Sequence, residues 1–138
     1  MIGAQLSNWG QDSGFAGRSF QLAIVILKTC LVEFDVLNAF DFHIFLVVEG
    51  AKSDARPKRL QVRTRGRWIF AKANIAFSEW NSLSEPERRA LANDTIKVMV
   101  AAIGERAIKK FDVPRGEIEL VISFFERELE DRTRLEQL

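Results

Sequence analysis

The sequence has very few of the residues that build disulfides and metal centres: it contains one cysteine, Cys30, and one histidine, His43. A single cysteine cannot form a disulfide within the chain, which argues against a disulfide-rich secreted scaffold and fits a reducing compartment. A cysteine inside an apolar run is more often an inert, buried thiol than a nucleophile. One cysteine and one histidine cannot complete a usual zinc site, and no clustered acidic loop indicates a hard-cation site. We therefore expect no bound metal and a cytoplasmic protein.

Long hydrophobic runs are also missing. The most apolar stretch, 20–34, is about 15 residues long and contains Lys28 and Glu33, whereas a membrane-spanning helix needs about 20 predominantly apolar residues. This stretch is therefore expected in a hydrophobic core. Residues 1–17 lack a basic segment followed by an apolar one, so we expect no signal peptide.

The sequence also lacks the motifs of common catalytic sites. It contains neither of the glycine-rich phosphate-binding patterns and no G-x-S-x-G nucleophile elbow. Acidic pairs such as Glu117 and Glu119 show no sign of the burial that would shift a carboxyl pKa. His43 next to Asp41 is more typical of a structural polar residue than of a catalytic one. We expect no enzyme activity, no catalytic residue and no cofactor.

Size and composition indicate one globular domain. The chain has 138 residues, of which 47% are hydrophobic and 28% charged, and its net charge is +1. This length is typical of a single domain and is enough to bury a core without a metal or disulfide. Because the net charge is close to zero, attraction to nucleic acid or to a membrane must come from local patches. We expect one α+β domain over 1–138.

Alternation of apolar and polar residues predicts strands. Residues 1–6 fit a short first strand. Segment 41–49 has one apolar face and one mixed face, the latter with Asp41, His43 and Phe45. Segments 60–65 and 68–77 are typical of a hairpin that turns at Gly66. Because these strands follow one another in the chain, we expect a small antiparallel sheet, a meander that contains the hairpin.

Helical spacing dominates the rest. Stretch 20–34 is ambiguous: its β-branched residues favour a strand, whereas its length and its apolar residues at helical spacing favour a helix, which we adopt. Ser84 and Glu87 form a capping box that starts a second helix, which ends near Pro114. Its expected core stripe comprises Leu91, Thr95, Val98, Met99, Ala102, Ile103 and Ala107. A last helix follows, so the expected fold packs the sheet against two C-terminal helices and one N-terminal helix.

Charge is unevenly distributed along the chain. Between positions 52 and 72 there are eight basic residues and one acid; the basic ones are Lys52, Arg56, Lys58, Arg59, Arg63, Arg65, Arg67 and Lys72. From Glu117 onward, seven acidic residues outnumber three arginines. On a two-residue period, arginines of the hairpin share one side, next to a tryptophan. Arginine and tryptophan are enriched at interface hot spots, and guanidinium forks bind carboxylates or phosphates. The predicted partner-binding residues are therefore Arg59, Arg63, Arg65, Arg67 and Trp68. The alternative is a solvated face that the acidic C-terminal segment balances within the molecule.

The order of segments over about 80 residues, 38–120, resembles the immunity protein 39 family of bacterial polymorphic-toxin systems. The features that carry the resemblance are an aromatic strand from Phe40 to Gly50, a polar connection with Pro57, a hairpin turning at Gly66, and a helix whose end reads IKKFDVP, up to Pro114.

This resemblance implies an immunity protein that binds a cognate toxin domain in the bacterial cytoplasm and neutralises it by stoichiometric protein–protein interaction. Two other functions fit the residues. One is an RNA- or nucleotide-binding regulator that uses the basic hairpin. The other is a subunit of a homo-oligomer, in which the sheet face and Phe124 or Phe125 would be buried against copies of the same chain.

Overall fold

The computed structural model describes the backbone of residues 2–7, 18–49 and 60–136, and side chains over 22–46, 60–76 and 78–135. In chain order the elements are β1 (Ile2–Ser7), α1 (Arg18–Glu33), the 3-10 helix η1 (Asp35–Asn38), β2 (Asp41–Glu49), β3 (Gln61–Arg65), β4 (Trp68–Ala76), α2 (Phe77–Ser82), α3 (Glu85–Phe111) and α4 (Arg115–Glu136). The expected combination of a sheet with helices is confirmed, as are a first strand and the N-terminal helix.

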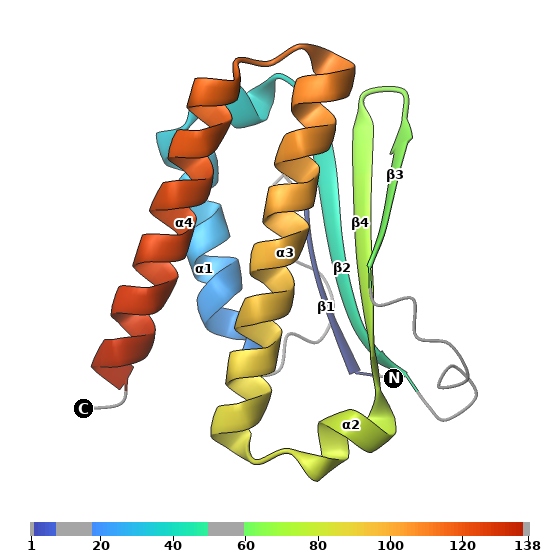
Figure 1. Cartoon of the computed structure of the whole chain (residues 1–138), viewed down its shortest axis with the longest axis vertical. Helices are drawn as coiled ribbons and strands as arrows, with labels where there is room; N and C mark the ends of the chain where they lie inside the picture. The colour runs from blue at the N-terminus through green and yellow to red at the C-terminus, as the bar shows by residue number, and fades with distance from the viewer. Residues whose placement is uncertain (1, 8–17, 50–59, 137–138) are drawn as a thin grey trace.

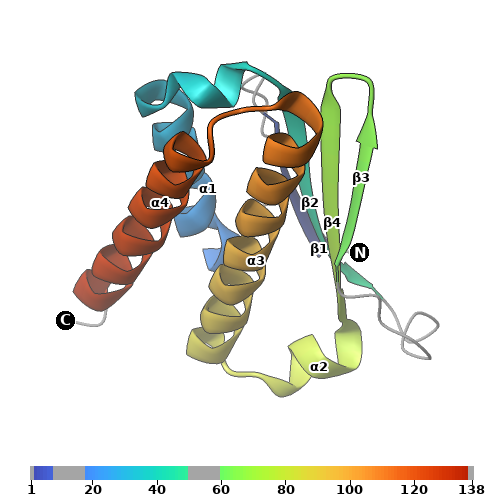
Figure 2. The same cartoon turned by 45° about the horizontal axis from the view of Figure 1, so that its top comes forward.

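The long helices lie together on one side of the sheet (Figures 1 and 2). Helix α3 packs against β2, β3 and β4, whereas α1 and α4 pack against α3 and against each other. The short helix α2 joins the end of β4 to the start of α3 at one end of the molecule (Figure 1). No helix of the described ranges is long and apolar enough to cross a membrane.

The sheet is mixed, with strand order β1-β2-β4-β3. Strands β1 and β2 are antiparallel, as are β3 and β4, but β2 and β4 are parallel. The expected antiparallel meander is therefore wrong, although the hairpin at Gly66 is confirmed. The reason lies in composition: β2 and β4 are nine residues long with apolar inner faces, so they take the centre, whereas the five-residue, arginine-bearing β3 suits an edge.

The inner face of the sheet supplies much of the core. Its fully buried side chains are Phe42, Ile44 and Leu46 from β2 and Ile69, Ala71, Ala73 and Ile75 from β4. These pack with helix side chains into one hydrophobic cluster. Trp80 of α2 is buried in the same cluster.

Helix α1 resolves the ambiguity of 20–34. Ala23, Ile26 and Cys30 are completely buried, at spacings of three and four residues, whereas Val25 and Val32 are 42% and 81% exposed. One buried stripe and one exposed stripe are the mark of a helix against a core. Helical spacing therefore outweighs the β-branched composition of this segment.

The boundaries of α3 follow local rules. Ser84 accepts a hydrogen bond from the Glu87 N–H, and the Glu87 carboxylate accepts one from the Ser84 N–H, which confirms the capping box. At the other end, Asp112 has φ 54° and leaves the helix in the left-handed region, and Pro114 precedes α4.

The expected core stripe of α3 is partly wrong. Met99, Ile103 and Ala107 are buried, but Val98 is 55% exposed. Because α3 lies between the sheet on one side and α1 and α4 on the other, its buried surface is wider than the predicted stripe and is rotated away from Val98. The residues that complete this buried surface are Ala92, Asn93, Ile96, Val100 and Gly104.

Gly104 sets the distance between α3 and α4. A Cβ atom at this position would lie 2.7 Å from Cγ2 of Ile118, whereas a Cβ at Gly116 would meet nothing within 4 Å. We expect Gly104→Ala to lower the free energy of unfolding by about 1–3 kcal/mol relative to Gly116→Ala, because only the first variant overpacks the core, whereas a methyl group at Gly116 enters open space. Urea unfolding of the two variants measures the difference. Equal stabilities would contradict a tight helix contact.

The capping box gives a second prediction. Ser84→Ala removes the acceptor for the Glu87 N–H and should lower the free energy of unfolding by about 1 kcal/mol. Ser84→Asp, which restores an N-cap acceptor, should recover most of the loss. Thermal unfolding followed by circular dichroism would show both changes, and an unaltered midpoint for Ser84→Ala would argue against the cap.

Candidate functional site

The face of the sheet turned away from the helices carries a cluster of partly buried aromatic rings. His43 and Phe45 come from β2, and Trp68 and Phe70 come from β4. Side chains alternate between the two faces of a strand, so these residues lie opposite the buried inner row. The parallel register of β2 and β4 places His43 beside Phe70. We call this surface the open face.

The rings contact one another along the strands and across them. The Trp68 and Phe70 rings are stacked, with centroids 5.7 Å apart and an interplanar angle of 17°. The His43 ring lies 6.3 Å from Phe70 and 6.3 Å from Phe45. Ring pairs at such separations stabilise beyond their buried area. The cluster is therefore an ordered, partly exposed apolar platform.

Cationic side chains border this platform. Arg63 and Arg65 of β3 pair in register with Phe70 and Trp68, and both arginines are exposed. On β4 itself, two residues after Phe70, Lys72 places its Nζ 5.9 Å from the ring centroid of Phe45, within range of a cation–π contact. The open face thus combines aromatic rings with three basic side chains.

Arg67 does not extend the arginine row. It lies in the turn that Gly66 makes with φ +57°, and its Nε is 3.6 Å from Oδ2 of Asp41. The Asp41 N–H also donates to the Arg67 carbonyl at 2.8 Å. The turn is thereby fastened to the start of β2. Arg59, the remaining predicted residue, lies outside the described residues.

The described part of the acidic C-terminal helix lies apart from the hairpin. Helix α4 lies beyond α3 and far from β3 (Figure 1). Its arginines pair within the helix, Arg132 with Glu128 at 3.2 Å and Arg134 with Glu130 at 3.6 Å. Both pairs lie within α4, so these two arginines engage acidic residues of their own helix.

His43 is the one imidazole of the open face. Burial lowers its pKa below the ordinary value of 6.5, which favours the neutral ring near neutral pH. The carboxylate of Asp41, on the same strand, lies within ion-pair distance of Arg67. Within the described ranges, no group of three or more His, Cys, Asp or Glu side chains is placed to hold a metal ion.

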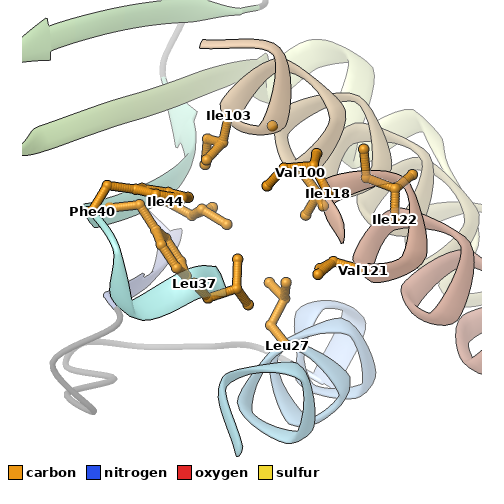
Figure 3. A pocket seen from close by; sticks show the side chains of 11 residues that line it. Leu27, Leu37, Phe40, Ile44, Val100, Ile103, Ile118, Val121 and Ile122 are labelled. Carbon is orange, nitrogen blue, oxygen red and sulfur yellow. The ribbon is translucent and has the colours of Figure 1, made fainter. Parts of the chain in front are cut away.

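An apolar gap lies between the helices and the sheet (Figure 3). Its volume is ≈ 30 Å³, and its walls come from α1, η1, β2, α3 and α4. Leu27, Phe40 and Val121 are among the lining residues, and all of these are apolar. Because its lining side chains are all apolar, this gap offers no group for acid–base chemistry. The open face, by contrast, carries basic and aromatic side chains.

Sequence reasoning identified part of this site. It named Arg63, Arg65 and Trp68, which the structure brings together. It also placed His43 and Phe45 on the mixed face of their strand, but it did not include Phe70 or Lys72 among the partner-binding residues. The two-residue period from Trp68 already places Phe70 and Lys72 on the same side. The period of 41–49 gives the face of Phe45, but its contact with Lys72 depends on the pairing of β2 with β4.

No family model, curated protein or solved structure matches this chain. The likeness to the immunity protein 39 family therefore stays a prediction. The structure itself defines a mixed α/β protein whose sheet is covered by helices on one face and bears an aromatic and basic surface on the other.

The cysteine yields a prediction of chemical inertness. Cys30 is completely buried, and burial raises the pKa of its thiol to about 12. The thiolate is the reactive form, so a thiol reagent at pH 8 should modify the native protein only as fast as the chain unfolds. Modification in urea should be immediate. Rapid reaction of the native protein would contradict this burial.

Proposed function

We propose that this chain is a protein-binding module whose open face binds an acidic surface of a partner protein. We further propose that the partner is the toxic domain of a bacterial toxin, which the chain inhibits by stoichiometric binding. The first proposal rests on the geometry of the open face. The second rests on the resemblance of 38–120 to immunity proteins.

The observation that carries the proposal is the combination of an aromatic platform with two exposed arginines. Trp68 and Phe70 offer apolar area at the centre, and Arg63 and Arg65 stand beside them with no ion pair to a described carboxylate. Protein interfaces are enriched in aromatic residues and arginine, and their hot spots tend to lie in partly desolvated centres. Carboxylates on a partner would complete the charge pattern.

The arrangement of the rings favours a protein over a nucleic acid. Nucleobases stack on open ring faces. Here Trp68 and Phe70 stack on each other, and the Lys72 ammonium lies over Phe45. The net charge of +1 adds no general attraction to phosphates.

Single-stranded RNA is the second candidate, because a stacked Trp68–Phe70 pair beside two arginines could still accept a base at its end. Such binding would weaken steeply with salt as counterions are released. Because binding of an acidic protein surface by the same arginines is also screened by salt, the chemical nature of the captured molecule, protein or RNA, separates the two candidates.

The test is parallel affinity capture with tagged proteins from cells of the source organism. The wild type is compared with the double variant Arg63→Glu/Arg65→Glu, with Trp68→Ala, and with Arg127→Glu, a control on the exposed side of α4. We expect the wild type and the control to retain one protein in near one-to-one amount. Each open-face variant should lose affinity by about thirtyfold or more, the size of a hot-spot loss of about 2 kcal/mol.

A captured protein that is toxic when expressed alone, and harmless when co-expressed with this chain, would support the toxin partner. Recovery of RNA alone, lost at high salt, would overturn the proposed function in favour of the second candidate. A protein captured equally by all four baits would show that the open face is not the binding surface.

A further inference from the structure

Strand β3 is an edge strand of the described sheet, and no other described strand pairs with its outer side. It pairs with β4 on one side and ends the sheet on the other. The last pair of the β3–β4 ladder is Arg65 with Trp68, and a two-residue turn joins them. In an antiparallel pair, alternate residues direct their N–H and C=O groups toward the neighbour, so those of Val62 and Thr64 point outward.

One side chain of α3 now occupies this edge. Arg106 donates from Nη2 to the Val62 carbonyl at 3.4 Å and from Nη1 to Oγ1 of Thr64 at 3.2 Å. The first distance lies beyond the usual range of about 2.7–3.2 Å, so the bond is weak. Within the described ranges, Arg106 is the only residue outside the sheet that hydrogen-bonds to Val62 or Thr64. The edge is thus held by a donor that another N–H could replace.

A hollow continues the edge on the helix side. It has a volume of ≈ 490 Å³ and lies between Val62 and the outer stripe of α3. Ile108 gives it an apolar wall, and Arg106 and Lys109 add two cations. Arg115 also borders it but is bound to Glu105 through two hydrogen bonds of 2.8 and 3.3 Å.

We propose that the outer edge of β3, together with this hollow, binds an extended acidic segment of a protein partner as an added strand. The segment would pair with Val62 and Thr64, replace Arg106 at the Val62 carbonyl, and release that guanidinium to bind a carboxylate. Main-chain bonds of this kind give affinity, and alternate side chains give specificity.

Charge determines the sequence of the segment. Its side chains on the open-face side would meet Arg63 and Arg65, so acidic residues belong at those alternate positions. Its side chains on the other side would enter the hollow beside Val62 and Ile108, which takes apolar residues with an acid within reach of Lys109. The matching segment alternates acidic and apolar residues and lacks proline.

The same charges disfavour a second copy of this chain at the edge. The strand reads QVRTR, so two β3 strands placed side by side would bring the arginines of both onto one face. Like charges opposite one another destabilise a strand pair. Strand addition by a foreign acidic segment is therefore the arrangement that the edge selects.

This inference deepens the proposed function, because it gives the mode by which the protein partner attaches. It is tested without the natural partner. The full chain is used to select binders from a random twelve-residue peptide library displayed on phage, and the enriched peptides are then synthesised. We expect a consensus of alternating acidic and apolar residues.

Variants then locate the binding. Thr64→Pro removes an outward N–H at an edge, where proline is tolerated, whereas the control Thr64→Val removes only the hydroxyl. We expect Thr64→Pro to weaken peptide binding by about tenfold relative to Thr64→Val. Circular dichroism checks that both variants fold.

Amide hydrogen exchange gives a readout on the unaltered protein. The amides of Val62 and Thr64 should exchange rapidly in the free chain and slow by at least about tenfold with the peptide bound, whereas those of Arg63 and Arg65 are already within the β3–β4 ladder. This measurement decides the matter even if Thr64→Pro does not fold.

Several outcomes would overturn strand addition. They are failure to select any peptide, a consensus without acidic residues, self-association of the chain through β3, or peptide binding that leaves the Val62 and Thr64 amides unprotected. In each case the proposed function could still stand, since partner capture on the open face is measured separately. Loss of all protein capture would instead remove the proposed function itself.

Discussion

The structure depends on a sheet that is apolar on one face only. Phe42, Ile44 and Ile69 are among the inner side chains that are almost completely removed from water, and burial of such apolar area is the dominant stabilising term in folding. Everything else is arranged around that layer. Helix α3 lies on it, α1 and α4 close the core from outside, and Gly104 lets α3 and α4 approach closely. The opposite face is consequently left to side chains that do not serve the core.

Features set by neighbouring residues could be predicted from the sequence. The hairpin needs only Gly66 in the left-handed region, the start of α3 needs only Ser84 and Glu87, and helix α1 needs only its own spacing. Each of these signals lies within a few positions of the chain. The same is true of Arg63, Arg65 and Trp68, which a two-residue period places together.

Features set by partner choice could not be predicted in this way. Sequence order suggested that β2 would lie beside β3, but the centre of a sheet takes strands that can be buried, and β4 is the more apolar of the two. Phe45 joins Lys72 only through that choice. Arg106 reaches Val62 across 44 positions, and Arg67 turns to Asp41 because of the turn geometry. None of these contacts produces a periodic pattern in the sequence that could have predicted it.

The parallel pairing of β2 and β4 has a consequence for the order of folding. Each residue of β2 pairs with the residue 27 positions later, as Asp41 with Trp68, whereas Arg65 and Trp68 face each other across a two-residue turn. Closing the longer loop costs more chain entropy, so we expect the β3–β4 hairpin to assemble first. During that interval β3 covers one edge of the apolar β4, and its arginines discourage contact with other unfinished chains. We therefore expect the strand that ends the completed sheet also to protect the unfinished sheet from aggregation.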